Sequence, residues 1–143
     1  MKHIIYLLTL YFNILYVVCV CSDKYGTINS KHRLDVTDGV EIIESGSFNH
    51  CKKLKTVFLP DSVHTIEEYA FANSGIQRLL GAEGLQTLGN WSFANCSHLR
   101  IIDAENVTSW DYNAINNTNM FSSTFKPATF FYAIIQKNGV GIF

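Results

Sequence analysis

Apolar residues recur along the chain with a period of 22 to 23 residues. Four sets of apolar positions share this period, and their offsets from one another are constant to within one residue. They are Phe48, Phe71 and Phe93; Val40, Val63, Leu85 and Val107; Ile43, Ile66, Leu88 and Trp110; and the pairs Leu54 and Val57, Ile76 and Leu79, Leu99 and Ile102. A fixed period of this length indicates a repeat architecture. A unit this short cannot bury its own apolar face, so successive units must stack to bury it.

Each repeat divides into a short strand and a segment that returns the chain. The pattern Leu-x-x-Val-x-Leu from Leu54 to Leu59 is closed by Pro60, which predicts a strand and its end. The segment that follows lacks the apolar positions of a long helix, so we expect it to turn back through short connections. The same frame extends in degenerate form to Leu34 and Pro127. We therefore predict a mainly β solenoid over residues 34–127, with about four stacked coils.

The repeat also matches a known sequence pattern. The segment L-x-x-V-x-L-P-x-S-V-x-x-I-x-x-x-A-F, from Leu54 to Phe71, resembles the BspA-type leucine-rich repeat, as do the F-x-x-C-x-x-L segments at Phe48 and Phe93. The resemblance covers roughly two thirds of the chain and departs from the pattern at Ser74, where one residue is missing and serine replaces cysteine. It implies a right-handed solenoid with strands lining one face. It also implies a secreted or cell-surface protein of a bacterium or parasitic protist, often an adhesin or antigen.

The recurring apolar positions and the cysteines are expected to form the core. These residues are Phe48, Cys51, Leu54, Val57, Ile66, Phe71, Ile76, Leu79, Leu88, Phe93, Cys96, Leu99 and Ile102. Cys51 and Cys96 share a column with Ser74 between them, so two layers, or about 10 Å, separate them. That distance is too long for a disulfide or for a zinc ion shared by both thiolates. We interpret each cysteine as a small buried thiol and expect the neighbouring histidines, His50 and His98, to face solvent.

The outward positions of the predicted strands form the candidate binding face. We expect this face to stack three cationic residues beside three apolar ones. They are Lys55, Arg78 and Arg100, and Phe58, Leu80 and Ile101. Aromatic, aliphatic and arginine side chains together are typical of protein-binding patches. The sequence therefore suggests an adhesion module that binds a host or matrix protein, with a preference for acidic partners. The alternative is a structural antigen or truncated repeat protein without a partner, in which these are ordinary surface residues.

Charge and motifs argue against several other functions. The formal net charge is −1, so no basic field favours nucleic acid. The sequence contains no nucleophile elbow, phosphate-binding glycine loop, His-Glu-x-x-His motif or Cys-x-x-Cys pair. Short coils also offer little of the concave enclosure that an active site needs. We expect a protein that is not an enzyme and that needs no metal or other cofactor.

The two ends of the chain differ from the repeats. Residues 1–21 contain one lysine and no acid and are almost wholly apolar from Ile4 onward, which is typical of a secretory signal peptide. An uncleaved signal anchor is the alternative, and it would supply the only membrane contact. We assign residues 22–33 to a lead-in and residues 128–143 to a tail or cap. A secreted or surface location follows from this assignment, and cleavage after Cys21 would leave Cys51 and Cys96 as the only cysteines.

Four N-glycosylation sequons lie after the leader. They begin at Asn90, Asn95, Asn106 and Asn116. In a eukaryotic protein, glycans at these positions would mark exposed edges of the connecting segments, whereas in a bacterium the pattern has no such meaning. Asn106 and Asn116 are the stronger candidates, because Asn95 adjoins the cysteine column and tryptophan is an awkward middle residue after Asn90.

Overall fold

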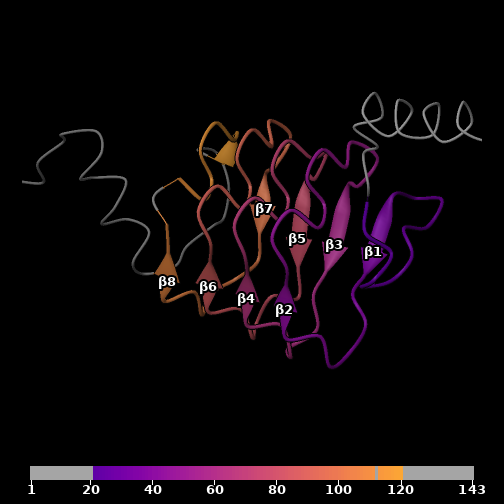
Figure 1. Cartoon of the computed structure of the whole chain (residues 1–143), viewed down its shortest axis with the longest axis horizontal. Helices are drawn as coiled ribbons and strands as arrows, with labels where there is room; N and C mark the ends of the chain where they lie inside the picture. Colours follow the sequence, from indigo (N-terminus) through magenta and orange to yellow (C-terminus); the bar gives the residue numbers. More distant parts are fainter. Residues whose placement is uncertain (1–20, 112, 121–143) are drawn as a thin grey trace, which may run out of the picture.

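The computed structural model describes residues 21–111 and 113–120, and their strands form two parallel sheets. Sheet A contains β1 (Arg33–Asp35), β3 (Thr56–Phe58), β5 (Arg78–Leu80) and β7 (Ile101–Ile102). Sheet B contains β2 (Ile42–Ile43), β4 (Thr65–Ile66), β6 (Thr87–Leu88) and β8 (Ser109–Trp110). The chain visits the two sheets alternately, so each turn adds one strand to each sheet and the sheets grow side by side along the long axis (Figure 1). The predicted mainly β solenoid is confirmed.

Strand pairing follows the repeat frame of the sequence. In sheet A, Leu34 pairs with Val57, Val57 with Leu79, and Leu79 with Ile102. In sheet B the paired residues are Ile43, Ile66, Leu88 and Trp110. Each period of 22 to 23 residues is therefore one full turn of the solenoid, and residues one period apart lie in adjacent rungs.

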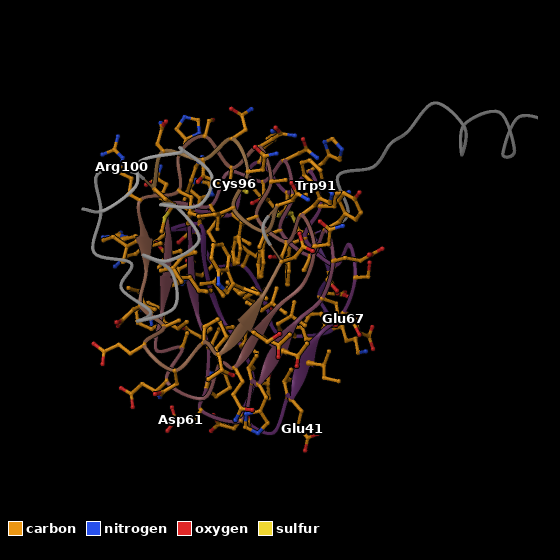
Figure 2. The ribbon with its side chains drawn as sticks, turned by 90° about the vertical axis from the view of Figure 1, so that its left-hand side faces the viewer. Glu41, Asp61, Glu67, Trp91, Cys96 and Arg100 are labelled. Atoms are coloured by element: carbon orange, nitrogen blue, oxygen red, sulfur yellow. A yellow bond between two sulfur atoms is a disulfide. The ribbon has the colours of Figure 1, made fainter. Side chains whose placement is uncertain are left out.

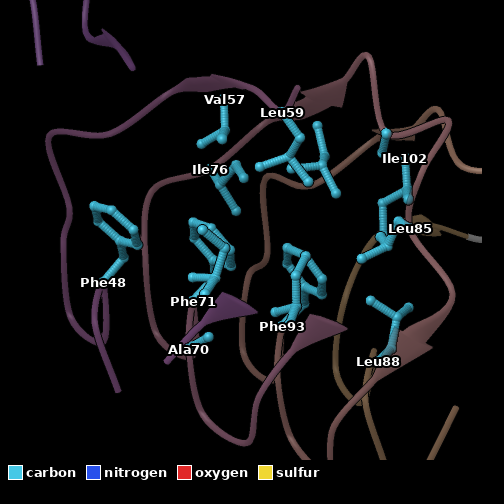
Figure 3. Close-up of a cluster of buried hydrophobic side chains, with 14 of the residues drawn as sticks. Phe48, Val57, Leu59, Ala70, Phe71, Ile76, Leu85, Leu88, Phe93 and Ile102 are labelled. Carbon is cyan, nitrogen blue, oxygen red and sulfur yellow. The ribbon is translucent and has the colours of Figure 1, made fainter. Parts of the chain in front are cut away.

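The interior is organised around a ladder of phenylalanine rings. The ring centroids of Phe48 and Phe71 are 5.1 Å apart with planes 6° from parallel, and those of Phe71 and Phe93 are 5.1 Å apart at 4°. Aliphatic side chains from both sheets surround the rings (Figure 3). All the residues expected in the core have at most 1% of their surface exposed. Close packing of equivalent side chains from successive rungs thus supplies the apolar burial that no single repeat could provide.

Gly75 allows the repeat that is one residue short to stack on its neighbours. The turn that follows Ser74 is one residue shorter than the turns that follow Cys51 and Cys96. Gly75 lies under the preceding rung, and its amide donates a hydrogen bond to the Cys51 carbonyl oxygen at 3.0 Å. A Cβ at this position would overlap the carbonyl oxygen of Lys52. The shortened turn therefore requires glycine.

A disulfide joins Cys21 to Cys51, with Cα atoms 5.2 Å apart. The interpretation of Cys51 as a free thiol is therefore wrong. Its partner, Cys21, is the last residue of the segment that the sequence assigns to the leader. Cys51 lies in the first F-x-x-C turn, which has no equivalent turn before it, so Cys21 can approach from the open end of the column.

The residues after Cys21 cover the N-terminal end of the core. Tyr25 is 1% exposed, and its ring lies 5.7 Å from that of Phe48 at the end of the ladder. Its hydroxyl oxygen accepts a hydrogen bond from the Glu44 amide at 3.0 Å. The lead-in is thus packed against the first rung, as a solenoid end requires.

Several sequence predictions fall on residues outside the described range. They concern the leader in residues 1–20, the degenerate repeat after Met120, and the tail or cap in residues 128–143. Between residues 21 and 120, with residue 112 left out, no helix is long and apolar enough to cross a membrane.

Candidate binding face

The outward side chains of sheet A lie in three neighbouring columns, here called the sheet A face. Arg78 pairs with Ile101, and Phe58 pairs with Leu80. Lys55, Gln77 and Arg100 form the third column, because the Gln77 amide donates to the Lys55 carbonyl at 2.8 Å and the Arg100 amide donates to the Gln77 carbonyl at 3.0 Å. The predicted stacking of Lys55, Arg78 and Arg100 in one column is therefore wrong. Arg78 is paired with Ile101, in the column next to that of Lys55 and Arg100.

Cationic groups project from this face, and apolar groups are half-covered. Arg78 and Arg100 are exposed, whereas Lys55 and the three apolar residues of the face are half-buried. Thr56 also points outward by strand alternation, but only 7% of its surface is exposed. It lies between Arg33 and Arg78 in its column, and such long side chains can cover a small neighbour. The face thus combines apolar surface with projecting guanidinium groups.

The arginines of the sheet A face differ in what they contact. The Arg33 guanidinium carbon lies 3.7 Å from the centroid of the Phe58 ring, and its Nη2 forms an ion pair with Asp35 at 2.6 Å. Arg78 and Arg100 form no ion pair with any residue between Cys21 and Met120 that the structure describes. Each guanidinium keeps five N–H donors that an external carboxylate can accept.

Acidic residues lie on several sides of the coil, and one of them, Asp35 in β1, is paired with Phe58 in sheet A and forms an ion pair with Arg33. Viewed along the solenoid axis, Arg100 lies on one side of the coil and Glu67 on the other, with Asp61 and Glu41 at a third edge (Figure 2). Arg100 is thus separated from Glu67, Asp61 and Glu41, which lie on the other sides of the coil.

The remaining cysteine has a packing role. Cys96 is fully buried, and its thiol donates to the Phe71 carbonyl oxygen at 3.0 Å and lies 3.4 Å from Ser74 Oγ. Burial raises the pKa of the Cys96 thiol, so it stays protonated and a poor nucleophile at neutral pH. His50 and His98 are exposed. In the part of the chain that the structure describes, no three His, Cys, Asp or Glu residues are grouped to hold a metal ion.

An asparagine ladder runs along the turn beside the cysteine column. The side-chain nitrogen of Asn73 donates to Asn49 Oδ1 at 3.2 Å, that of Asn95 to Asn73 at 3.1 Å, and that of Asn117 to Asn95 at 2.9 Å. Asn73, Asn95 and Asn117 have φ of 55° to 57°, a left-handed conformation that asparagine adopts more readily than most residues. Sequence reasoning missed this ladder, although the repeat frame aligns its last three members.

The four sequons occupy different environments. Asn106 is exposed, and its side-chain nitrogen donates to the Glu83 carbonyl at 2.7 Å. Asn116 is half-buried. The side-chain oxygen of Asn90 is buried and has no hydrogen-bond partner among the described residues. A glycan on Asn95 would be attached to the nitrogen that donates within the ladder.

These features define a class of protein: a parallel β-solenoid whose strands line two sides of the coil. The family model for the BspA type leucine rich repeat region matches residues 25–134 in six copies. The chain therefore belongs to the BspA-type leucine-rich repeat family. The match starts at Tyr25, the first ring of the core ladder. No curated protein and no solved structure gives a significant match.

Family membership supports a coarse description of the function. Proteins of this family are commonly secreted or at the cell surface and are often related to adhesion. Leucine-rich-repeat modules commonly mediate protein interactions, and repeats of this family are typically non-enzymatic.

Proposed function

We propose that this chain is a secreted or cell-surface adhesion module whose sheet A face binds an acidic region of a host or matrix protein. One observation carries the proposal: Arg78 and Arg100 project without an ion pair, within the described residues, beside the half-buried Phe58, Leu80 and Ile101. Arginine and aromatic residues beside apolar surface are the groups that dominate binding energy at protein interfaces. The opposite charge of the partner would orient it and raise its association rate.

The disulfide supports export of the chain. Disulfides persist in oxidising compartments and are rare where glutathione keeps thiols reduced. Cleavage after Cys21 would remove one half of the bridge to Cys51. We therefore place the end of any cleaved leader before Cys21, earlier than the sequence suggested. Sequencing the N-terminus of the exported protein tests this placement: a start at or before Cys21 is expected, and a start at Ser22 would contradict it.

In a eukaryotic source, Asn106 is the most suitable position for a glycan. Its side chain is exposed, whereas the Asn90 oxygen is buried and Asn95 belongs to the ladder. Asn116 remains the second candidate. Such glycans would lie on the turns and leave the sheet A face free.

The binding proposal is tested with a charge-reversed face. The variant K55E/R78E/R100E should lose saturable binding to purified matrix proteins immobilised as a panel, with affinity reduced at least about tenfold. The melting temperature should stay within about 4 °C of the unmodified chain, because all three changes are at the surface. Biolayer interferometry and calorimetry give the two quantities.

A charge-matched variant separates this face from general electrostatic attraction. K31E/K52E/K53E reverses three exposed lysines in the turns that precede the strands. It should bind much more strongly than K55E/R78E/R100E. Equal losses in the two variants would show that only net charge matters, and unaltered binding by the face variant would refute the proposal.

A further inference from the structure

Two large aromatic residues occupy a backbone position that favours glycine. In three successive rungs, the turn after the sheet B strand contains a residue with positive φ: Gly46 at 69°, Tyr69 at 55° and Trp91 at 56°. These rungs are adjacent, because the Gly46 amide donates to the Glu68 carbonyl at 3.2 Å and the Tyr69 amide donates to the Asn90 carbonyl at 3.1 Å. The left-handed conformation is sterically unfavourable for bulky side chains and easy for glycine. Tyrosine and tryptophan therefore stand where the fold alone would favour glycine.

This position lies on the side of the coil away from the sheet A face. Trp91 and Glu67 lie across the coil from Arg100 (Figure 2). Tyr69 is 41% exposed, and it and Ile42 are the exposed large hydrophobic residues of the described range. Trp91 is half-buried. Tyrosine and tryptophan are the residues most enriched among those that dominate binding energy at protein interfaces.

Acceptor groups directly precede the two aromatics in the sequence. Glu67 and Glu68 directly precede Tyr69, and Glu67 Oε2 is held by the Ser45 amide at 2.9 Å. Neither carboxylate forms an ion pair with a cation in residues 21–111 or 113–120. The residue before Trp91, Asn90, has a buried side-chain oxygen with no donor among those residues. That oxygen is covered by the chain itself, so it is the two carboxylates that favour a cationic hydrogen-bond donor.

The preceding rung shows what such a pair of groups binds. There the Lys24 ammonium pairs with the Glu44 carboxylate and lies 5.4 Å from the centroid of the Tyr25 ring. Glu44 and Glu67 are equivalent, because each follows one of the paired residues Ile43 and Ile66 in sheet B. The carboxylate at this position thus already holds a lysine within this chain, and a neighbouring aromatic ring, that of Tyr25, adds cation–π attraction.

We propose that Glu67, Glu68, Tyr69 and Trp91, here called the aromatic edge, form a second docking surface for a lysine- or arginine-bearing segment of a partner protein. A cation over Trp or Tyr is stabilised by the ring, and the two carboxylates supply the opposite charge. Arg78 and Arg100 project from the sheet A face and would repel such a segment, so the two surfaces select partners of opposite charge. This inference is independent of the function proposed for the sheet A face.

The test uses a fluorescein-labelled peptide with the sequence acetyl-GKGRGKGR-amide and measures its binding by fluorescence anisotropy. In Y69G/W91G, both aromatics are replaced by the residue that the chain has at position 46, so the backbone conformation is preserved and the net charge is unchanged. This variant should bind the peptide at least about fivefold more weakly. E67Q/E68Q should weaken binding to a similar extent.

The charge-matched control is D61N/E83Q. It removes two exposed carboxylates from the turns that connect sheet A to sheet B, and it should change the affinity less than about twofold. Y69N, which keeps a residue tolerant of positive φ, provides a second aromatic deletion if Y69G/W91G does not fold. Calorimetry identifies folded variants.

Two results would overturn the proposal. One is the absence of peptide binding to the unmodified chain at about 1 mM, the weak end of specific association. The other is equal weakening by E67Q/E68Q and D61N/E83Q with no effect of removing the aromatics, which would show unspecific attraction to an acidic protein. K55E/R78E/R100E should bind the peptide at least as well as the unmodified chain, so this test does not depend on the sheet A face.

Discussion

At the scale of single residues, Asn95 links three rungs through one side chain. Its amide nitrogen donates to Asn73, its amide oxygen accepts from Asn117, and its backbone has φ of 57°. The residue at this position must adopt the left-handed conformation, and its side chain must both donate and accept a hydrogen bond. Few residue types can do both. The recurrence of asparagine at this position is therefore better explained by the ladder than by N-glycosylation.

We expect Asn95→Ala to lower the free energy of unfolding by about 1–2 kcal/mol, because it removes the ladder contacts and strains the backbone. Asn95→Gly keeps the backbone conformation and removes only the side chain, so its loss should be smaller. Urea denaturation measures both. Full stability in the alanine variant would show that the ladder does not stabilise the turn.

Cys96 illustrates how burial controls a reactive group. Because burial raises the pKa of its thiol above the ordinary value of 9.0, the thiolate is scarce in the folded protein at pH 8. Iodoacetamide should alkylate Cys96 slowly in the native chain and rapidly in urea, as followed by mass spectrometry. Stability from the protonated thiol is present below pH 9 and is lost as the pH rises toward the raised pKa. Native alkylation as fast as that of free cysteine would contradict the buried placement.

At the scale of elements, the rungs are joined by ladders of equivalent side chains. Phe71 has a parallel ring 5.1 Å away on each side, so the phenylalanines form one continuous stack (Figure 3). Strands of two or three residues contribute few hydrogen bonds each. The stacked rings and aliphatic columns therefore supply the main part of the energy that holds one rung on the next.

The N-terminal lead-in is the element that depends on the disulfide. The bridge closes a loop with a sequence separation of 30 residues, and Tyr25 lies within it. Replacing both cysteines, as in C21S/C51S, should lower the free energy of unfolding by about 3–4 kcal/mol. The main reason is that the unfolded chain gains conformational entropy when the bridge no longer constrains it.

Urea denaturation with and without a reducing agent tests the bridge. The reducing agent should destabilise the unmodified chain and leave C21S/C51S unaffected, with Cys96→Ser as a control that still responds to reduction. Hydrogen exchange should accelerate most in residues 22–37. A chain whose stability is the same with and without the reducing agent would contradict a structural bridge.

The repeat frame predicted the elements of sheet A and the core but not the elements of sheet B. A strand such as Thr65–Ile66 has one buried residue and one half-buried residue, so it is too short to show alternation. The sequence shows that Ile66 and Leu88 occupy the same repeat position. A recurring apolar position alone, however, does not distinguish a strand from a turn. The disulfide was missed because Cys21 lies at the end of an apolar segment that reads as a leader.

The candidate site was predicted in part for a similar reason. Alternation around Val57 identified which residues face outward, but the column that each residue joins depends on a one-residue deletion near Gly75. The aromatic edge was missed because Tyr69 and Trp91 look like ordinary residues of a connecting segment. In the sequence, only their alignment with Gly46 points to a left-handed backbone. The meaning of that alignment becomes clear when the positive φ of all three residues is seen in the structure.

At the scale of the whole molecule, the solenoid displays two different surfaces on opposite sides of one narrow coil (Figure 2). The sheet A face has Arg78 and Arg100 beside apolar residues, and the aromatic edge has carboxylates beside Tyr69 and Trp91. Leucine-rich-repeat modules commonly mediate protein interactions, and two such surfaces would allow one module to bind two different partners. Because exposed charges are screened by salt, association through either surface should weaken as ionic strength rises.

Site-specific photo-cross-linking tests most directly whether the sheet A face is the binding surface. Leu80 in β5 and Thr87 in β6 belong to the same turn but to opposite sheets. Each is replaced in turn by the photo-cross-linker p-benzoylphenylalanine, and the chain is irradiated with the matrix protein that it binds. Our account predicts a cross-linked product from position 80 and none from position 87. Saturable binding with a product only from position 87 would contradict it.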